Sequence, residues 1–300
     1  MDRVIPAPFF IAGPTASGKS AVAVGLAKRI GGEIVNADAF QLFEGLDVLT
    51  AKPGAAERAA VPHHLFGEVP AQDAFDAAAY QALALRAIAE IAARGNRPVV
   101  VGGSGLYLKT LTHGLSPLPP GDPALRAALE PLGRATQVAW LLRLDPAFTD
   151  TQNPRYVSRA LEVTLLTGQP STRLKQDWHA APPGLVSGVV LVPDRATLYA
   201  RIDRRVEAMV AGGALDEVAA FPEDAQNASR AIGVDEFRAH LRGELSLQEA
   251  VAAVQRATRR FAKRQLSWFR REKYLHTICP GENDAVDTTV SAILDHFPDL

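Results

Sequence analysis

The feature that most constrains this chain is a glycine-rich loop close to its first residue. Residues 13–20 match the Gly-x4-Gly-Lys-Ser pattern of phosphate-binding loops and read Gly13-Pro14-Thr15-Ala16-Ser17-Gly18-Lys19-Ser20. An apolar run, Pro8–Ala12, precedes the loop, and an amphipathic stretch follows it, as the motif requires. The glycines let backbone N–H groups face an anion at a helix N-terminus, while Lys19 supplies a charge and Ser20 a hydroxyl for Mg²⁺. The loop predicts a strand, a phosphate site and a helix in that order.

Apolar runs and helical stretches then alternate along the sequence. Glu33–Asp38, Pro98–Val101 and Gly184–Pro193 read as buried strands, and Asp76–Arg94 reads as a helix with Asp76 as its N-cap. Strands that alternate with helices indicate parallel βαβ units. We predict an α/β fold, with a P-loop NTPase-like parallel sheet core flanked by helices.

A helical insertion is expected within this core, over residues 119–184. Its helices should begin at Asp122-Pro123 and Asn153-Pro154, where an N-cap residue precedes a proline, and Gly168 should end the second one. Val138–Leu144 fits a strand or a helix equally well.

The core then consists of two parts, residues 1–118 and 185–300. After Pro193 the chain is expected to be helical, ending in a long basic segment that begins at Ser246. Glu249 lies three residues further on, which completes a capping box.

The basic segment stands out from a nearly neutral chain. The net charge is −1, yet Arg256–Lys273 holds eight Lys or Arg and one acid, so this stretch carries +7 and the rest −8. Arg256, Arg260, Lys263 or Arg264, and Arg271 recur near helical spacing. Such a run forms either a solvated helix face or a nucleic-acid contact.

The composition places the chain among ordinary globular proteins. Hydrophobic residues make up 47% and charged residues 22%, which excludes a disordered or collagen-like chain. Cys279 is the single cysteine, and the first residues lack the basic and apolar regions of a signal peptide. No apolar stretch approaches the ~20 residues that span a bilayer. We expect a cytoplasmic monomer without a membrane segment.

An acidic candidate residue, Asp38, lies at the end of the second predicted strand, Glu33–Asp38. No strand ends in the Asp of a nucleotidase Walker B motif, because Val99–Val101 runs into Gly102-Gly103. Asp38 instead should lie at the carboxyl edge of the sheet beside the loop, where ligands bind. A carboxylate repels phosphate, so a base or a Mg²⁺ partner is its better role. His63 and His64 lack zinc-site spacing and are read as turn or packing residues.

Taken together, several blocks resemble one family. They are the loop at 13–20, Asn36–Gln41, Gly45–Asp47, Thr50–Pro53, Pro62–Leu65, Val101–Tyr107, Arg159–Val163, Arg230–Gly233 and Ala262–Gln265. In this order they are similar to bacterial tRNA dimethylallyltransferases, and the resemblance spans Ile11 to Arg271. The chain departs from the family's usual residues at Ala39 (usually Ser), Leu49 (usually Gly) and Val234 (usually aromatic).

The resemblance implies a reaction and its residues. The loop would hold the diphosphate of dimethylallyl diphosphate with Mg²⁺, and the five-carbon group would pass to N6 of the adenosine 3′ of a tRNA anticodon. Asp38 would accept the N6 proton, Ser104 and Arg126 would serve the diphosphate side, and Arg201 would help to bind diphosphate. The anticodon stem-loop would contact Asp38, Ala39, Phe40, Gln41, Arg155, Arg159, Arg230, Gly233, Arg256, Arg260, Lys263, Arg264 and Gln265.

Alternative activities remain open on the sequence alone. An isopentenyltransferase acting on free AMP, ADP or ATP would share the loop, as would a P-loop small-molecule kinase or a nucleotide-dependent RNA-binding module without catalysis. A mononucleotide needs neither the basic segment nor the insertion, which favours tRNA as the acceptor.

Overall fold

Six parallel strands form one sheet in the part of the chain that the structure describes. The structure is a computed structural model that describes residues 7–115, 118–180, 186–225, 227–281 and 284–300. The strands run in the order β3-β2-β4-β1-β5-β6, and every pairing is parallel. They are β1 (Phe9–Ala12), β2 (Gly32–Asn36), β3 (His63–His64), β4 (Arg97–Gly102), β5 (Ser187–Leu191) and β6 (His276–Ile278). The predicted α/β fold is confirmed.

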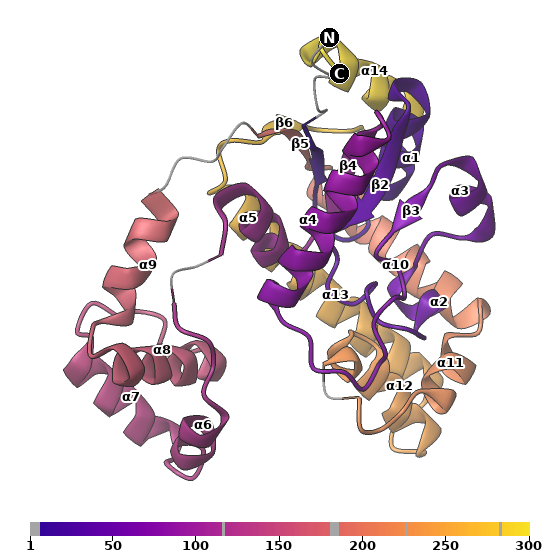
Figure 1. The fold of residues 1–300 in the computed structure, drawn as a ribbon. Coiled ribbons are helices and arrows are strands. Elements are labelled where there is room, and N and C mark those ends of the chain that lie inside the picture. The colour runs from indigo at the N-terminus through magenta and orange to yellow at the C-terminus, as the bar shows by residue number, and fades with distance from the viewer. Residues whose placement is uncertain (1–6, 116–117, 181–185, 226, 282–283) are drawn as a thin grey trace. The chain divides into compact units, whose positions relative to one another are not determined.

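Helices lie beside the sheet (Figure 1), and alternating side chains of β1 belong to the two apolar clusters next to it. Phe9 and Ile11 of β1 pack with α1 (Lys19–Ile30) and α14 (Val286–His296). Phe10 and Ala12 belong to the opposite cluster, with α4 (Ala77–Ala93) and α5 (Gly105–His113). Strand side chains point alternately to opposite faces, so a strand covered by helices on both faces is apolar throughout.

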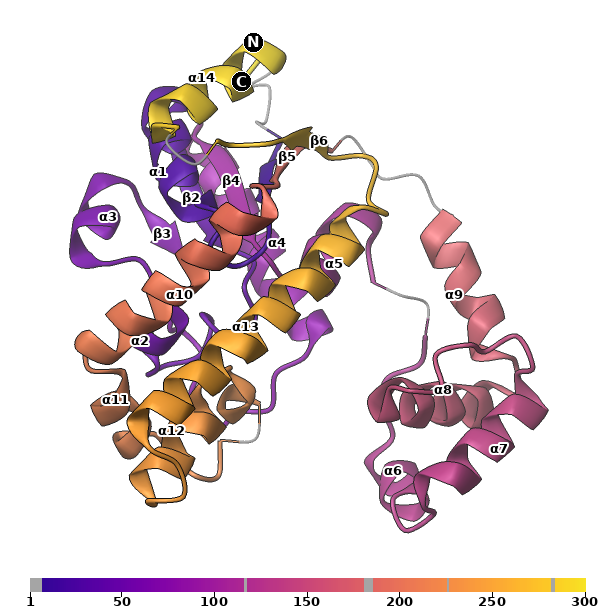
Figure 2. The ribbon, with the colours of Figure 1, turned by 180° about the vertical axis from the view of Figure 1, so that it is seen from behind.

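The remaining helices of the α/β core lie between β2 and β3 or between β5 and β6 in the sequence. Figure 2 shows α10 and α13 side by side. The helices are α2 (Asp47–Thr50), α3 (Ala55–Ala60), α10 (Arg195–Ala211), α11 (Ala214–Ala220), the 3-10 helix η1 (Ala228–Arg230), α12 (Val234–Leu241) and α13 (Leu247–Phe269). The capping box of Ser246 and Glu249 begins α13 as predicted, because each residue bonds the other's backbone N–H.

The chain divides into two compact units. The core unit comprises residues 1–112 and 185–300, and the helical unit comprises residues 113–184; the insertion was expected over 119–184. The helical unit contains α6 (Pro123–Leu129), α7 (Arg134–Leu144), α8 (Pro154–Thr167) and α9 (Ser171–Ala180). Its own apolar cluster includes Leu129, Leu141, Val157 and Leu161, so this unit has a core of its own.

The predicted helix ends are confirmed where a cap residue signals them. The carboxylates of Asp76 and Asp122 accept backbone N–H bonds at the start of α4 and α6, and Asn153 does so for α8. Gly168 ends α8 with a left-handed φ of 66°. The ambiguous run Val138–Leu144 lies in α7 and is helical.

The structure differs from the predictions in its short strands and in the end of β2. β3 and β6 were not expected, because two or three residues carry too little periodicity to be detected. His63 and His64 form β3, where a His64 ring nitrogen hydrogen-bonds the Glu33 carboxylate at 2.7 Å. Strand β2 ends at Asn36, so Asp38 lies in the loop beyond it. Gly184 and Leu185, the start of the predicted strand Gly184–Pro193, lie outside the described residues.

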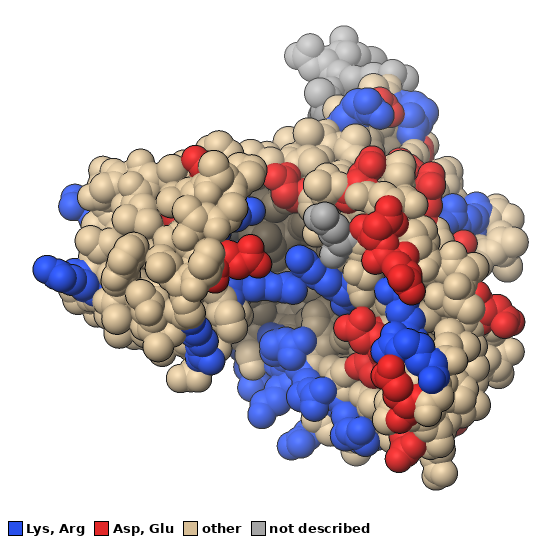
Figure 3. Space-filling model, turned by 90° about the horizontal axis from the view of Figure 1, so that it is seen from below, with Lys and Arg blue, Asp and Glu red and all other residues tan. Residues whose placement is uncertain are grey.

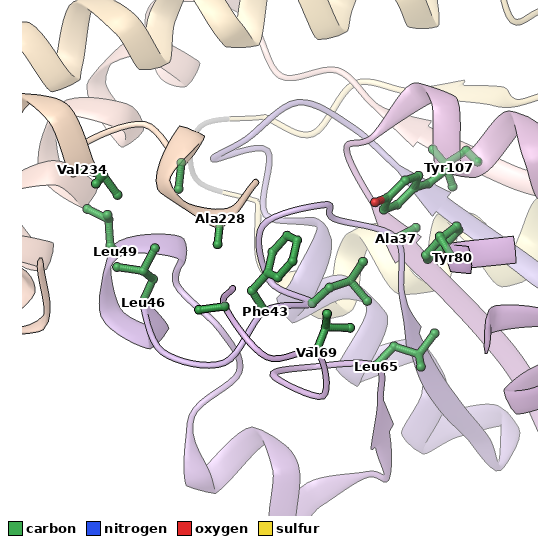
Figure 4. Close-up of a cluster of buried hydrophobic side chains, with 14 of the residues drawn as sticks. Ala37, Phe43, Leu46, Leu49, Leu65, Val69, Tyr80, Tyr107, Ala228 and Val234 are labelled. Atoms are coloured by element: carbon green, nitrogen blue, oxygen red, sulfur yellow. The ribbon is translucent and has the colours of Figure 1, made fainter. Parts of the chain in front are cut away.

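Two of the departures from the family's usual residues lie next to each other. Leu49 of α2 and Val234 of α12 are buried side by side in the larger apolar cluster (Figure 4). A Cβ at the neighbouring Gly233 would lie 2.6 Å from a methyl carbon of Leu49. A larger residue at 49 and a smaller one at 234 therefore keep the packed volume nearly constant, which is the core exchange that proteins tolerate best.

Candidate active site

The glycine-rich loop adopts the conformation of an anion-binding turn. Gly18 has a φ of 89° and Ala16 a φ of 63°, both left-handed, and α1 begins directly afterwards at Lys19. A Cβ at Gly13 would lie 2.7 Å from the Ser17 hydroxyl oxygen and 2.9 Å from the Leu191 carbonyl oxygen. The Ser17 hydroxyl is buried and has no hydrogen-bond partner among the described residues. Strain and an unpaired polar atom in one loop fit a site completed by a polar ligand.

Lys19 lies half-buried at the start of α1, and its ammonium donates to the Pro14 carbonyl at 3.3 Å. Burial lowers the pKa of Lys19 to about 8, with Asp38 opposing the shift and Arg205 adding to it. A cation that burial disfavours gains when an anion binds beside it. The lysine is therefore suited to hold a phosphate group.

Two arginines of α10 lie close to the loop. An Nη atom of Arg201 lies 3.8 Å from the Cβ position of Gly18, which places it where diphosphate binding was predicted. Arg205 donates to the Thr50 carbonyl at 3.1 Å, and burial lowers its pKa while Asp38 opposes that shift. Arg205 was missed from the sequence, although it lies one helical turn after Arg201 and so shares its face.

The loop after β2 holds Asp38 firmly. The Asn36 amide oxygen accepts the Asp38 N–H at 2.8 Å, and the Asp38 carboxylate accepts the Phe40 N–H at 3.1 Å. The Ser104 hydroxyl, from the loop after β4, accepts the Ala39 N–H at 2.9 Å. These bonds leave a carboxylate oxygen of Asp38 available, because only one is used by Phe40.

Close backbone contact brings the two loops together. A Cβ at Gly102 would lie 2.0 Å from the Ala37 carbonyl oxygen, so β4 must end in glycine. The Ala37 N–H donates to Val101 at 2.7 Å, and the Ser104 N–H donates to the Ala37 carbonyl at 3.2 Å. The carboxyl ends of adjacent parallel strands thus present Asp38 and Ser104 at one edge of the sheet.

A pocket connects these groups to an apolar wall. Its polar lining comes from Thr15, Asp38, Thr50, Arg205 and Thr258. Its apolar lining comes from Phe40, Leu49, Ile202, Val206, Met209, Ala231, Ile232, Val254 and Phe261. A cavity with charged and polar side chains on one part of its lining and apolar side chains on another suits a ligand with an anionic group and a hydrocarbon group.

The outer face of α13 is basic. Arg256, Arg260, Lys263 and Arg264 are exposed, whereas Val254, Ala262 and Phe269 of the same helix are buried. Arg259 is paired with Asp203 of α10. On the face seen in Figure 3, Lys and Arg side chains gather in one area with few acidic residues between them, which is the charge pattern that binds a phosphate backbone.

Comparison with known proteins decides the family. The profile of the family described as "IPP transferase" matches residues 41–272. A tRNA dimethylallyltransferase of Anaeromyxobacter sp. (strain K) is 50% identical over 96% of this chain and 97% of that protein, and one of Akkermansia muciniphila is 42% identical over 96% and 98%. The crystal structure of a tRNA isopentenylpyrophosphate transferase from Bacillus halodurans superimposes with a TM-score of 0.72 at 35% identity, covering 97% of this chain and 95% of that one.

The chain belongs to the IPP transferase family. Membership confirms the resemblance found in the sequence and the expectation of a prenyltransferase. It favours the tRNA dimethylallyltransferase reading over the free-nucleotide and kinase alternatives, since the similar proteins are tRNA dimethylallyltransferases along nearly their whole length.

Several predicted site residues lie in the helical unit. Arg126 and Arg159 both bind the fully buried carboxylate of Glu162. Burial would raise the pKa of Glu162, but hydrogen bonds from both arginines hold it below its usual value. Arg155 is exposed. The structure thus gives Arg126 and Arg159 a partner in their own unit, and their predicted roles stay predictions.

The other predicted tRNA contacts are spread over the core unit. The Gln41 amide donates to the Thr50 and Ala51 carbonyls at 2.9 Å each. Arg230 is exposed in η1, and Gly233 begins α12 with a φ of 107°. Gln265 is only 6% exposed, so its amide is not presented on the basic face of α13.

The described residues contain no cluster of three or more His, Cys, Asp or Glu that could hold a metal ion. A Mg²⁺ ion usually binds one or two protein groups together with substrate phosphates and water. The Ser20 hydroxyl is exposed at the start of α1, and Asp38 lines the pocket, so each offers an oxygen donor of the kind that this mode uses.

Among the residues that the structure describes, no helix is long and apolar enough to cross a bilayer.

Proposed function

We propose that this chain transfers the dimethylallyl group of dimethylallyl diphosphate to N6 of the adenosine 3′ of a tRNA anticodon. The observation that carries the proposal is a pocket whose lining joins Thr15 of the phosphate loop, Asp38 and Arg205 to an apolar wall. The diphosphate belongs with the loop and the cations, and the five-carbon group belongs with the wall.

The phosphate loop and its cations would stabilise the leaving group. As the C–O bond to the dimethylallyl carbon breaks, its electron pair stays on the diphosphate oxygen, and the diphosphate thereby gains one negative charge. Backbone N–H groups at the start of α1, the Lys19 ammonium, Arg201 and Arg205 would stabilise that charge, a role supported by their closeness to the phosphate loop. Preorganised donors of this kind are often the largest contribution to catalysis.

Asp38 would act as the proton acceptor. The adenine amine is a weak nucleophile, so its N–H proton must leave as the new C–N bond forms. The Asp38 carboxylate takes this proton, and the bonds from Asn36, Phe40 and Ser104 keep its loop in place. Carbon–nitrogen bond formation, carbon–oxygen bond cleavage and proton transfer then balance without a covalent enzyme intermediate.

Magnesium fits this site as a partner of the substrate. The Ser20 hydroxyl would hold the ion, and the Asp38 carboxylate would be a second oxygen donor for it. When bound, Mg²⁺ neutralises phosphate charge.

Binding of tRNA is supported by the basic face of α13. Arg256, Arg260, Lys263 and Arg264 form an exposed cationic row, and phosphate contacts of this kind position an RNA without reading its sequence. The target base must leave its stack to reach Asp38, which costs least in a loop such as the anticodon loop. We propose that the helical unit adds contacts through Arg155, and that the enzyme acts as a monomer in the cytoplasm.

Label transfer tests the proposal directly. Radiolabelled dimethylallyl diphosphate is incubated with unmodified tRNA, with free AMP, and with a tRNA whose adenosine next to the anticodon is replaced by guanosine. A separate incubation contains ATP and phosphate acceptors. We expect label only in the unmodified tRNA. Label in AMP would favour the free-nucleotide activity, and phosphate transfer from ATP without label transfer would favour a kinase.

A further inference from the structure

The side chain of Gln265 links two loops of the candidate site. Its Oε1 atom accepts the N–H of Thr15 in the phosphate loop at 2.9 Å, and its Nε2 atom donates to the Gly103 carbonyl at 3.0 Å. Both bonds connect residues at least 162 positions apart in sequence. One amide therefore ties α13 to the loops that follow β1 and β4.

The side-chain amide of Gln265 is buried between the two loops. Gln265 is 6% exposed, while its neighbour Arg264 and the preceding Lys263 face solvent. A Cβ at Gly103 would lie 2.3 Å from Nε2 and 3.1 Å from the Gly13 carbonyl oxygen. Glycine at 103 is thus what allows the amide to enter between the two loops.

The bond to Thr15 sets the shape of the phosphate loop. A loop of this kind binds anions only while its N–H groups converge, and Thr15 is the third of its eight residues. The hydrogen bond from the Thr15 N–H to the Gln265 amide restrains the orientation of this peptide group. Thr15 also lines the pocket, so this bond restrains the phosphate loop at the point where it borders the pocket.

We propose that Gln265 is a positioning residue for the diphosphate loop and not a tRNA contact. The proposal rests on the proposed function for that loop. The two faces of α13 then have different roles. The exposed face carries Arg256, Arg260, Lys263 and Arg264, and the buried face supports the phosphate loop through Gln265.

The test compares binding of inorganic diphosphate with binding of tRNA. In Gln265→Met, which has a similar length and no hydrogen-bonding amide, we expect affinity for diphosphate to fall about tenfold, as the loss of a buried bond predicts. The KM for dimethylallyl diphosphate should rise in parallel, and tRNA affinity should stay within about twofold. Gln255→Met, the same change elsewhere on α13, is the matched control.

A double-mutant cycle tests whether Gln265 acts through Gly103. Gly103→Ala should displace the amide from its other end, so Gln265→Met combined with Gly103→Ala should bind diphosphate no more weakly than the worse single variant. Thermal melting checks that each variant is folded. Should Gln265→Met not fold, Gln265→Glu replaces it, because a carboxylate keeps the bond from Thr15 and loses only the donation to Gly103.

The outcomes separate the inference from the function on which it rests. Reduced tRNA affinity with unchanged diphosphate affinity would make Gln265 an RNA contact, and unchanged values in both assays would remove it from the site. Either result with a wild-type protein that transfers label overturns this inference alone. A wild-type protein that neither binds diphosphate nor transfers label overturns the proposed function.

Discussion

The hydroxyl of Ser104 accepts the backbone N–H of Ala39 at 2.9 Å. This bond crosses from the end of β4 to the loop after β2, and Asp38 is the residue beside it. Ser104 therefore shapes the loop that carries the proposed base, whatever contact it also makes with diphosphate.

Changing Ser104 should separate its hydroxyl from its size. Ser104→Thr keeps the acceptor and should be close to neutral, whereas Ser104→Ala leaves the Ala39 N–H unpaired at a cost of about 1–3 kcal/mol and should lower kcat. Steady-state kinetics with tRNA measure both. Ser291→Ala serves as the control, because it removes a serine hydroxyl on α14 that accepts a hydrogen bond from Arg29 of α1. Equal activity in all of these proteins would show that the bond to Ala39 has no catalytic consequence.

Asp38→Asn should remove the base and keep the loop. The asparagine oxygen still accepts the Phe40 N–H that Asp38 accepts at 3.1 Å, so the backbone has no reason to move. Turnover should fall about 10²–10⁴-fold, with tRNA and diphosphate affinities nearly unchanged. Single-turnover kinetics with saturating tRNA make the measurement, and a loss explained entirely by weaker binding would assign Asp38 to substrate binding.

Lys19 should make diphosphate binding depend on pH. Because the pKa of Lys19 is lowered to about 8, its ammonium group in the unliganded protein loses its proton as the pH rises through that value. Affinity for inorganic diphosphate should therefore fall. Lys19→Ala should bind weakly at every pH. Titration calorimetry from pH 6.5 to about 9.5, spanning this pKa, measures both proteins. Parallel curves would show that the pH dependence belongs to diphosphate.

The same lowered pKa predicts an effect on stability with the opposite sign to that on binding. Between about 8 and the ordinary lysine pKa of 10.5, the unfolded chain holds a proton that the folded chain has lost, so wild-type stability rises with pH in that window. Lys19→Met lacks this penalty. Without ligand it should melt at a higher temperature than wild type at pH 7, and the difference should shrink as the pH rises above about 8.

The sequence predicts features that depend on local signals. The phosphate loop follows from spacing alone, and the caps of α4, α6 and α8 follow from single residues such as Asp76 that bond to their own helix. Asp38 was found because a residue that follows a parallel strand must lie at the carboxyl edge of the sheet.

Other parts of the site need the tertiary fold. Nothing near Arg205 in sequence shows that Thr50 and Asp38 surround it. Gln265 sits in a basic segment and was assigned to RNA, yet its partners lie at least 162 residues away. Helical spacing alone does not say which face of α13 is buried around this residue, and that face decides its role.

The basic face of α13 makes a prediction about salt. Each phosphate contact releases condensed counterions, so the logarithm of tRNA affinity should fall linearly with the logarithm of salt concentration, by about −0.7 per contact with single-stranded RNA. Arg260, Lys263 and Arg264 are exposed on this helix. Replacing each of them singly by Gln should weaken tRNA binding and flatten the slope by about one contact. Diphosphate affinity should not change, because these side chains lie on the outer face.

An arginine elsewhere on the surface provides the control. Arg86 on α4 is as exposed as these residues, with 74% of its side chain accessible, but it lies on a helix without a basic row. Arg86→Gln should keep the wild-type slope and affinity. If the three α13 variants behave like Arg86→Gln, the row is a solvated face, and the tRNA contacts must be sought at Arg155 in the helical unit, where the same salt titration of Arg155→Gln would locate them.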